Sequence, residues 1–254
     1  MFWQPSLPTV TFATSCWEKD WRPILLDLNY LTVKQIGNHQ FPFAETLLVI
    51  NNVSNLDEVK RAAQAKVDAG ILTRFIVAEE MANEVLCHFQ LNRSDFRVGE
   101  DASLYTGVNP DWIYYNALGP LTAIYNASSE YLLYLTGDVY LEKPISWIDK
   151  ALRRMEKKSS YKVANLTWNE NYKEALLESY KREWNFYVAK QGFSDQMFLV
   201  RTKDFLQPIY GEIRPDSNHF PRGDVWEKRV FSFMKNRSWE RITFRRGSYT
   251  HKNF

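Results

Sequence analysis

The first half of the chain alternates short apolar runs with longer amphipathic stretches. The apolar runs have the length of strands and cover residues 9–14, 46–50 and 73–78. Between them, apolar residues recur at helical spacing over residues 24–35 and 58–69. Continuous apolar strands that alternate with helices are typical of a parallel sheet covered on both faces. We therefore expect an α/β fold.

Local signals agree with these helices. Pro23 stands where it can open the first helix. Asn55 or Ser54 can cap the second helix, and Gly70 can end it. A shorter helix is predicted over residues 81–89.

The middle of the chain predicts a loop, a buried helix and a fourth strand. Residues 92–111 are polar and read as a loop. Residues 111–127 form a helical stretch with few charges, in which Gly119–Pro120 marks the middle or a break. Its low charge indicates a helix that lies buried across the sheet. Residues 131–135 are a continuous apolar strand that runs directly into Thr136, Gly137 and Asp138.

The second half is less regular. No internal repeat and no Pro-, Gly- or Ser-rich linker divides the chain, so residues 1–254 are expected to form a single domain. The predicted elements are a basic amphipathic helix (146–157), a strand (161–166), a helix (172–187), a strand (197–201), a helix (226–234), a short strand (242–244) and a tail (247–254).

Composition is that of a soluble globular protein, with 45% hydrophobic and 24% charged residues. Trp and Tyr are abundant, which suits either stacking on sugar faces or an aromatic-rich core. The net charge of +2 gives no field that would attract nucleic acid, so we expect no nucleic-acid partner. From Phe220 onward, nine Lys and Arg face three Asp and Glu. This basic segment can serve a diphosphate, an anionic membrane surface or solubility alone.

Several features bear on the compartment. Cys16 and Cys87 lack metal-ligand spacing and fit a reducing environment. No apolar run approaches the ~18 residues that span a bilayer. The first five residues do not read as a signal peptide. These features favour a cytoplasmic protein, with peripheral membrane contact through the basic C-terminal segment left open.

Asp138 is the strongest candidate for chemistry. It follows a buried strand directly, beside Gly137, which lets the backbone approach a ligand closely. A carboxylate at this position can bind Mg²⁺ or Mn²⁺, which bridge ligand phosphates. The alternative is an ordinary Asp in a turn at the end of a strand.

Polar residues also follow the other predicted strands. Thr14, Ser15 and Asn52 stand at or just after strand ends. In parallel sheets, ligands bind beyond the carboxyl ends of the strands, so these residues are candidates for the same site. They can equally be turn formers and helix caps.

The segment from Asn116 to Asp138 resembles the part of GT-A glycosyltransferases that leads into their DxD motif. The resemblance implies a GT-A (nucleotide-diphospho-sugar transferase) fold with a mostly parallel central sheet flanked by helices. It implies a UDP- or GDP-sugar donor, a divalent cation (Mn²⁺ or Mg²⁺) and a glycan acceptor. Residues 1–140 would bind the nucleotide and residues 141–254 the acceptor. This chain departs from the motif because Thr136 stands where the first acid is expected.

The same resemblance assigns the donor site. The first strand with Thr14 and Ser15 looks like the nucleotide-binding opening of these enzymes, and Asn52 follows a strand that looks like their second. Gly137 would lie against the donor.

The end of the chain resembles the late histidine element of several GT-A families. His251 would share the metal or the diphosphate with Asp138, and Arg245 would clamp phosphate oxygens. A disordered tail is the alternative for His251.

Two acidic residues compete for the acid–base role. Asp195 resembles an acidic motif of acceptor sites and is the preferred base, although it can also be a turn residue. Glu227 resembles a helix start found late in some bacterial glycosyltransferases, where it would bind the acceptor. Alternatively, Asp224 and Glu227 form a capping box.

Two other functions remain open. A sugar-phosphate nucleotidyltransferase uses a related sheet but usually opens with a Gly-rich loop, and residues 11–21 contain no Gly. A non-catalytic carbohydrate-binding or scaffold protein with a transferase-like fold is the third reading, because the first acid of the motif is missing.

Overall fold

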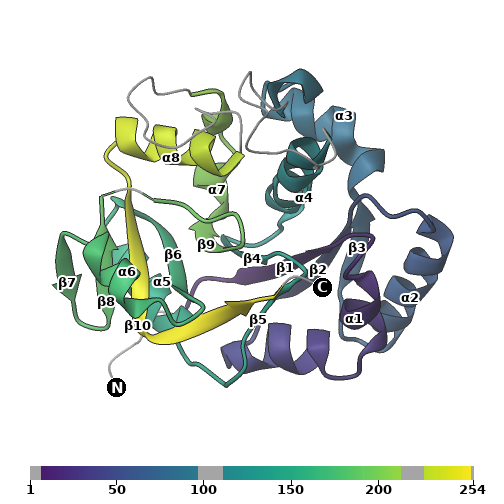
Figure 1. The fold of residues 1–254 in the computed structure, drawn as a ribbon, viewed down its shortest axis with the longest axis horizontal. Helices are drawn as coiled ribbons and strands as arrows, with labels where there is room; N and C mark the ends of the chain where they lie inside the picture. Colours follow the sequence, from purple (N-terminus) through teal and green to yellow (C-terminus); the bar gives the residue numbers. More distant parts are fainter. Residues whose placement is uncertain (1–6, 97–110, 191, 213–225, 253–254) are drawn as a thin grey trace.

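A single sheet runs through the molecule, and helices cover both of its faces (Figure 1). The computed structural model describes residues 7–96, 111–190, 192–212 and 226–252. The strands are β1 (Val10–Cys16), β2 (Glu45–Ile50), β3 (Arg74–Val77), β4 (Tyr131–Leu135), β5 (Val139–Tyr140), β6 (Tyr161–Trp168), β7 (Lys181–Glu183), β8 (Phe186–Ala189), β9 (Met197–Arg201) and β10 (Glu240–His251).

Within the described ranges, eight α-helices and several shorter helical turns connect the strands. The α-helices are α1 (Trp21–Leu26), α2 (Leu56–Asp68), α3 (Ala78–His88), α4 (Trp112–Asn126), α5 (Ile148–Lys157), α6 (Tyr172–Leu177), α7 (Thr202–Phe205) and α8 (Trp226–Asn236). The other turns are a π-helix, η1 (Tyr30–Ile36), and three 3₁₀ helices, η2 (Gly37–His39), η3 (Arg93–Phe96) and η5 (Ile209–Gly211).

The strand order is β3-β2-β1-β4-β9-β6-β10-β8-β7, with β5 paired to β10. Pairing is parallel from β3 to β4, as predicted, and also between β6 and β10. The other neighbours in the second half are antiparallel. The carboxyl ends of the first four strands therefore meet at one edge of the sheet, where α/β proteins bind ligands.

The two faces of the sheet carry separate cores. Alternate residues of β2 point to opposite faces, so that Leu48 and Ile50 pack with α1, η1, α2 and α5. Leu47 and Val49 pack with α3, α4, α7 and α8. The predicted α/β architecture of a sheet flanked by helices is confirmed.

The first predicted helix is interrupted. Residues 24–35 were expected to form one helix, but α1 ends at Leu26 and η1 begins at Tyr30. Asp27 causes the break, since its Oδ1 accepts hydrogen bonds from the backbone N–H groups of Asn29 (2.7 Å) and Tyr30 (3.1 Å). A side chain that bonds to the backbone in this way competes with the helix.

The predicted helix over residues 172–187 is wrong beyond its first turns. Helix α6 ends at Leu177, and a hairpin of β7 and β8 follows. Trp184 lies in the turn with a positive φ of 54°. β8 then pairs with β10, a partner more than fifty residues away that local sequence patterns do not reveal.

The predicted tail over residues 247–254 is also wrong as far as the structure describes it. β10 continues to His251, pairing first with β6 and then with β5. His251 is the register partner of Val139, directly after Asp138.

Helix α4 is continuous through Gly119 and Pro120 and lies buried across the sheet, as its low charge predicts. A Cβ on Gly119 would lie 3.3 Å from the hydroxyl of Tyr134 and 3.4 Å from Nδ2 of Asn51. The glycine therefore lets the helix approach the ends of β2 and β4 closely.

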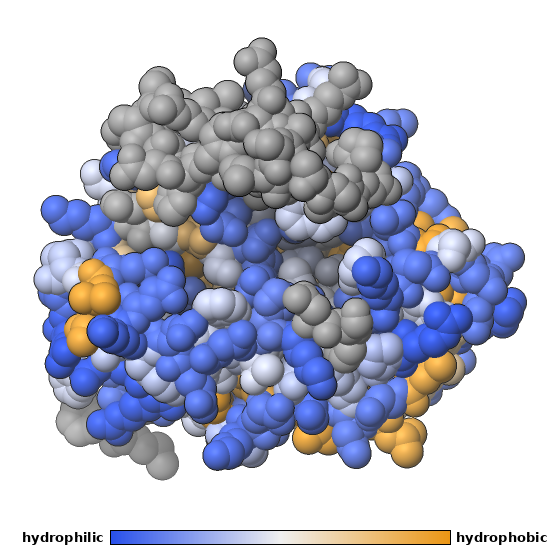
Figure 2. Space-filling model, viewed as in Figure 1, coloured by the Kyte–Doolittle hydropathy of each residue, from blue (hydrophilic) through white to orange (hydrophobic). Residues whose placement is uncertain are grey.

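The surface seen in Figure 2 is mainly hydrophilic, with apolar residues gathered near its left and lower right edges. Among the described residues, no helix has both the length and the apolar character needed to cross a bilayer.

Candidate functional site

The loop after β4 is held in place from the side of η1. Nε2 of Gln35 donates to the carbonyl oxygens of Gly137 (3.1 Å) and Val139 (2.9 Å). The hydroxyl of Tyr30 donates to the carbonyl of Gly137 (2.8 Å). These bonds turn the loop carbonyls toward η1 and fix the position of Asp138.

Gly137 is needed for close packing within the protein. A Cβ at this position would lie 2.5 Å from the carbonyl oxygen of Ser15 and 2.4 Å from Oδ2 of Asp20. The sequence predicts a glycine that admits a ligand, whereas the structure shows a glycine that admits the end of β1. Its contact with a donor stays a prediction.

Asp138 forms a pair with His251 across the end of the sheet. Oδ2 of Asp138 lies 3.0 Å from Nε2 of His251, and Oδ1 accepts a hydrogen bond from the Thr136 hydroxyl at 2.9 Å. The hydrogen bond to Asp138 raises the pKa of the His251 imidazole, because it stabilises the charged form. Both side chains are about one-fifth exposed, at 20% and 21%, so a ligand can reach them.

Strand pairing creates this proximity. The backbone N–H of Lys252 donates to the carbonyl of Asp138 (3.1 Å), next to the pairing of His251 with Val139. The expected association of His251 with Asp138 therefore matches the geometry of the chain.

The pair supplies one carboxylate and one imidazole. A divalent cation such as Mn²⁺ needs few protein ligands when substrate phosphates and water complete its shell. Asp138 and His251 fit this role as two ligands on a partly open edge. Among the described residues, no group of three or more His, Cys, Asp or Glu side chains could hold a metal by itself. The remaining ligands would have to come from the substrate and solvent.

Asp195 lies close to the pair, in the segment before β9. Burial and, to a smaller extent, the negative charge of Glu227 raise the pKa of its carboxyl to about 7, although Lys228 and His251 act in the opposite direction. Burial raises the pKa of Tyr249 on β10, and the negative charge of Asp195 adds to this rise. The structure thus brings Asp138, His251 and Asp195 into one electrostatic neighbourhood.

Glu227 stands in the first turn of α8. Its Oε1 lies 3.1 Å from Nζ of Lys228, and its charge reaches Asp195. The alternative capping box cannot be assessed, because Asp224 lies outside the described residues.

Asp20 is a buried carboxyl that the sequence reasoning missed. Its Oδ1 accepts the backbone N–H of Trp17 at 2.7 Å, and burial raises its pKa well above the ordinary range, with Asp138 adding to the rise. The only sequence signal was an Asp three residues after Trp17, the spacing at which a side chain bonds back to the backbone N–H at the start of a helical turn. Nothing in the sequence indicated its contact with the Gly137 loop.

The polar residues at the strand ends differ in what they can reach. Thr14 is fully buried, and its hydroxyl has no hydrogen-bond partner among the described residues. The Ser15 hydroxyl lies 2.8 Å from that of Tyr134. Asn52 is partly exposed, has a positive φ of 50° and donates its backbone N–H to Glu79. Donor contacts at all three remain predictions.

Arg245 is not brought together with Asp138. Its Nη1 donates to the carbonyl of Trp184 (3.0 Å), and its guanidinium lies 5.2 Å from the ring centre of Tyr187. The Arg245 side chain therefore packs against the β7–β8 hairpin. His251, which reaches the candidate site, lies six residues further along β10.

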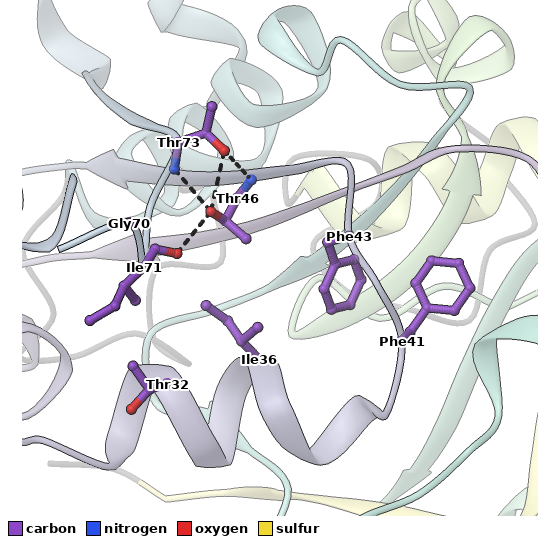
Figure 3. A pocket seen from close by; sticks show the side chains of 8 residues that line it. All are labelled: Thr32, Ile36, Phe41, Phe43, Thr46, Gly70, Ile71 and Thr73. Carbon is purple, nitrogen blue, oxygen red and sulfur yellow. Dashed lines mark hydrogen bonds between the residues drawn. The ribbon is translucent and has the colours of Figure 1, made fainter. Parts of the chain in front are cut away.

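A pocket of about 360 Å³ lies elsewhere, beside the amino ends of β2 and β3 (Figure 3). The Thr46 hydroxyl donates to the carbonyl of Ile71 and accepts from the backbone N–H of Thr73. None of the residues that line the pocket has an acidic or basic side chain. The side chains that line the pocket are therefore not the candidate catalytic groups. The lining residues are Thr32, Ile36, Phe41, Phe43, Thr46, Gly70, Ile71 and Thr73.

Comparison with known proteins adds evidence on the fold. No protein-family model and no curated protein matches the sequence. Among solved structures, the chain is similar to a mannosyltransferase from Pyrobaculum calidifontis in complex with GDP-Man and Mn²⁺, with a TM-score of 0.52 and 12% identity over 97% of this chain and 57% of the other. It is similar to GalNAc-T7 with UDP, GalNAc and Mn²⁺, with a TM-score of 0.53 and 9% identity over 98% of this chain and 44% of the other.

A third similar structure has a different reaction in its name. It is CMP:2-keto-3-deoxy-manno-octonic acid synthetase with CTP, with a TM-score of 0.50 and 12% identity over 95% of this chain and 90% of the other. At such low identity these likenesses establish architecture and not activity. The sheet order, the loop after β4 and these likenesses together show that the chain has the GT-A fold of nucleotide-sugar transferases.

Proposed function

We propose that this protein is a glycosyltransferase that moves a sugar from a nucleotide-diphosphate donor to a hydroxyl group of a glycan or another acceptor. The observation that carries the proposal is the pairing of Asp138 with His251, 3.0 Å apart, beside the partly buried Asp195. Two of the similar structures are transferases solved with a nucleotide or nucleotide sugar and Mn²⁺, which supports this class of donor.

Asp138 and His251 would hold a divalent cation, Mn²⁺ or Mg²⁺. When bound there, the cation supplies positive charge to the leaving nucleoside diphosphate. The protein's own part is to keep the two side chains convergent. Gln35 and Tyr30 fix the loop on one side, and the Lys252 backbone fixes it to β10 on the other.

Asp195 would act as the general base. It would take the proton of the acceptor hydroxyl while the oxygen attacks the anomeric carbon and the bond to the diphosphate breaks. A carboxyl with a pKa of about 7 is a stronger base than an exposed Asp and is still largely ionised at slightly alkaline pH. Glu227 would bind the acceptor from the start of α8.

The donor site would lie along the carboxyl ends of β1 and β2. Ser15 and Asn52 lie at or just after these strand ends and would contact the nucleoside. Gly137 would contact the diphosphate. Thr14 would act by shaping the buried strand, since its side chain is not exposed. The diphosphate clamp assigned to Arg245 is replaced by the Asp138–His251 pair.

Titration calorimetry tests this proposal. UDP-sugars, GDP-sugars and CTP are each titrated into the protein with and without Mn²⁺. We expect a UDP- or GDP-sugar to bind in a Mn²⁺-dependent manner, and Asp138→Asn and His251→Ala to weaken that binding at least about tenfold. Asp68→Asn, an exposed carboxylate at the end of α2, is the matched control and should bind normally.

The other outcomes separate the alternatives. Binding of CTP alone would favour a nucleotidyltransferase. Mn²⁺-dependent donor binding without any hydrolysis or transfer would favour a carbohydrate-binding scaffold. Slow donor hydrolysis in the absence of acceptor, lost in Asp138→Ala, would support an enzyme. Failure of every nucleotide to bind would reject the proposal.

A further inference from the structure

The tip of the β7–β8 hairpin presents a tryptophan to solvent. Trp184 is 84% exposed, whereas most of the other large aromatic side chains of the described chain are buried. The hairpin lies at the left edge of the molecule in Figure 1, at the opposite end of the sheet from α2. A Trp this exposed contributes little to the stability of the free protein, because it buries little apolar area.

Three arginines surround this tip. The guanidinium of Arg154 lies 6.0 Å from the ring centre of Trp184 and is ion-paired with Glu183 at 3.0 Å, and Arg245 donates to the Trp184 carbonyl. Arg182 and Arg245 lie over the ring of Tyr187, at 5.6 Å and 5.2 Å from its centre. Four elements, α5, β7, β8 and β10, thus contribute to one cationic and aromatic cluster.

Helix α5 extends this cluster. Its apolar residues, such as Leu152, face the core, whereas Arg153 and Lys157 are exposed. Of its two acidic residues, Asp149 lies in the first turn and Glu156 is paired with Arg201. A basic surface therefore continues from the hairpin along the helix.

The basic residues counted near the C-terminus separate into two groups. Several are engaged in ion pairs elsewhere, including Arg237 with Glu212 and Arg241 with Glu178. Arg245 and its exposed neighbour Arg246 are on the strand that borders the hairpin. Of the basic residues near the C-terminus, Arg245 thus lies beside Trp184, which the sequence alone did not indicate.

We propose that the β7–β8 tip and the solvent face of α5 form a docking surface for an anionic membrane. Lys and Arg near a bilayer are attracted to anionic headgroups, and Trp prefers the interface between headgroups and hydrocarbon. Trp184 enters that interface, while the exposed Arg182 and the neighbouring Arg245 contact lipid phosphates. The surface complements an anionic bilayer in charge and in the amphipathic character of its aromatic tip.

Docking in this orientation leaves the Asp138–His251 site free. The C-terminal end of β10 lies near the middle of the molecule in Figure 1, away from the hairpin. The proposal is therefore independent of the function proposed above, and each can fail without the other.

Co-sedimentation with vesicles tests the docking surface. The full chain is mixed with vesicles of phosphatidylcholine alone or of phosphatidylcholine and phosphatidylglycerol in equal parts. We expect binding only to the anionic vesicles, and weaker binding at high salt. Arg182→Glu should lower the partition coefficient about thirtyfold, and Trp184→Ala about tenfold.

Matched variants provide the controls. Arg61→Glu reverses an exposed charge on α2, at the far end of the sheet, and Trp112→Ala removes a partly exposed tryptophan from α4. Both should bind like the original protein. Circular dichroism establishes that each variant is folded. A second readout is the blue shift of tryptophan emission on adding anionic vesicles, which Trp184→Phe should abolish.

Three results would overturn the proposal. They are equal binding to both vesicle types, absence of binding to either, and loss of binding in the control variants to the same degree as in Arg182→Glu. If the protein binds an acidic protein but neither type of vesicle, the proposal is likewise overturned, and the surface has a protein partner instead.

Discussion

At the scale of single residues, the candidate site depends on one close approach and one long-range pair. Asp138 could be singled out from the sequence because it follows a continuous apolar strand. Asp20 could not, because its importance arises only when the turn after β1 packs against Gly137. A local pattern reveals which residues stand at strand ends, and it does not reveal what lies opposite them.

Gly137 offers a direct test of this packing. Gly137→Ala would place a methyl group 2.5 Å from the Ser15 carbonyl. We expect a loss of about 1–3 kcal/mol in the free energy of unfolding, because the loop must move. Gly211→Ala, where an added Cβ meets nothing within 4 Å, should change stability by less than about 0.5 kcal/mol. Urea denaturation measures both, and equal effects would contradict the packing argument.

Asp195 should link stability to pH. Its pKa in the folded protein is raised from the ordinary 3.8 to about 7, so the folded state binds the proton more tightly than the unfolded state. The contribution of this carboxyl to the free energy of unfolding is fully present below pH 3.8 and is lost as the pH rises through the pKa of the folded protein. An asparagine at this position would not ionise, so Asp195→Asn removes this loss. The variant should therefore become more stable relative to the original protein between about pH 4 and about pH 8, by roughly 1–4 kcal/mol.

The same substitution should remove transferase activity, since an amide cannot accept the proton. In the original protein, kcat/KM should rise with pH and level off above about pH 7, following the ionisation of Asp195. Denaturant titrations at several pH values and a pH–rate profile are the measurements. Full activity in Asp195→Asn would exclude this residue as the base.

At the scale of secondary structure, predictions succeeded where one strand or helix contains its own signal. β4 and β9 match their predicted ranges, and α2 begins after Asn55 and is followed by Gly70, as expected. The break at Asp27 in the first predicted helix has a local cause, whereas the two errors in the second half fall where pairing is non-local. The β7–β8 hairpin and the last third of β10 are stabilised by strands far away in the sequence, so their local composition read as a helix and a tail.

The end of β10 can be tested through one hydrogen bond. Lys252→Pro removes the N–H that donates to the Asp138 carbonyl, and the ring favours the extended backbone that His251 already has. We expect donor binding to weaken about fivefold with little change in overall stability. Lys252→Ala retains the N–H and should bind normally. Calorimetry of the two variants decides the matter, and identical affinities would show that the bond does not position the site.

At the scale of the whole molecule, the two halves share one sheet and one set of cores. The indole N–H of Trp147 on α5 donates to Nδ1 of the buried His39 on η2 at 3.0 Å, which joins the second half to the first. Burial lowers the pKa of His39 to about 3, so the ring remains neutral and able to accept this bond. We propose accordingly that residues 1–254 fold as a single domain.

A single domain should unfold in one cooperative transition. Thermal unfolding followed by far-ultraviolet circular dichroism and by tryptophan fluorescence should give coincident curves. Trp147→Phe removes the bond to His39 and should lower the midpoint of both curves together. Separate transitions for the two probes would indicate that the halves are independent units.

The fold class could be predicted from the first half alone. Its parallel strands are buried on both faces and therefore read as continuous apolar runs. The mixed pairing of the second half could not be predicted, because antiparallel neighbours such as β9 and β6 are separated by α6 and the hairpin.

The position of β10 also governs when the site can exist. Asp138 and His251 are 113 residues apart, and every strand of the parallel half precedes Asp138. During synthesis, which releases the amino-terminal part first, the strands that would cradle a donor can assemble on the ribosome long before His251 emerges. A nascent or prematurely terminated chain would thus carry the scaffold without the Asp138–His251 pair. On the function proposed above, metal binding would become possible only when translation has passed residue 251.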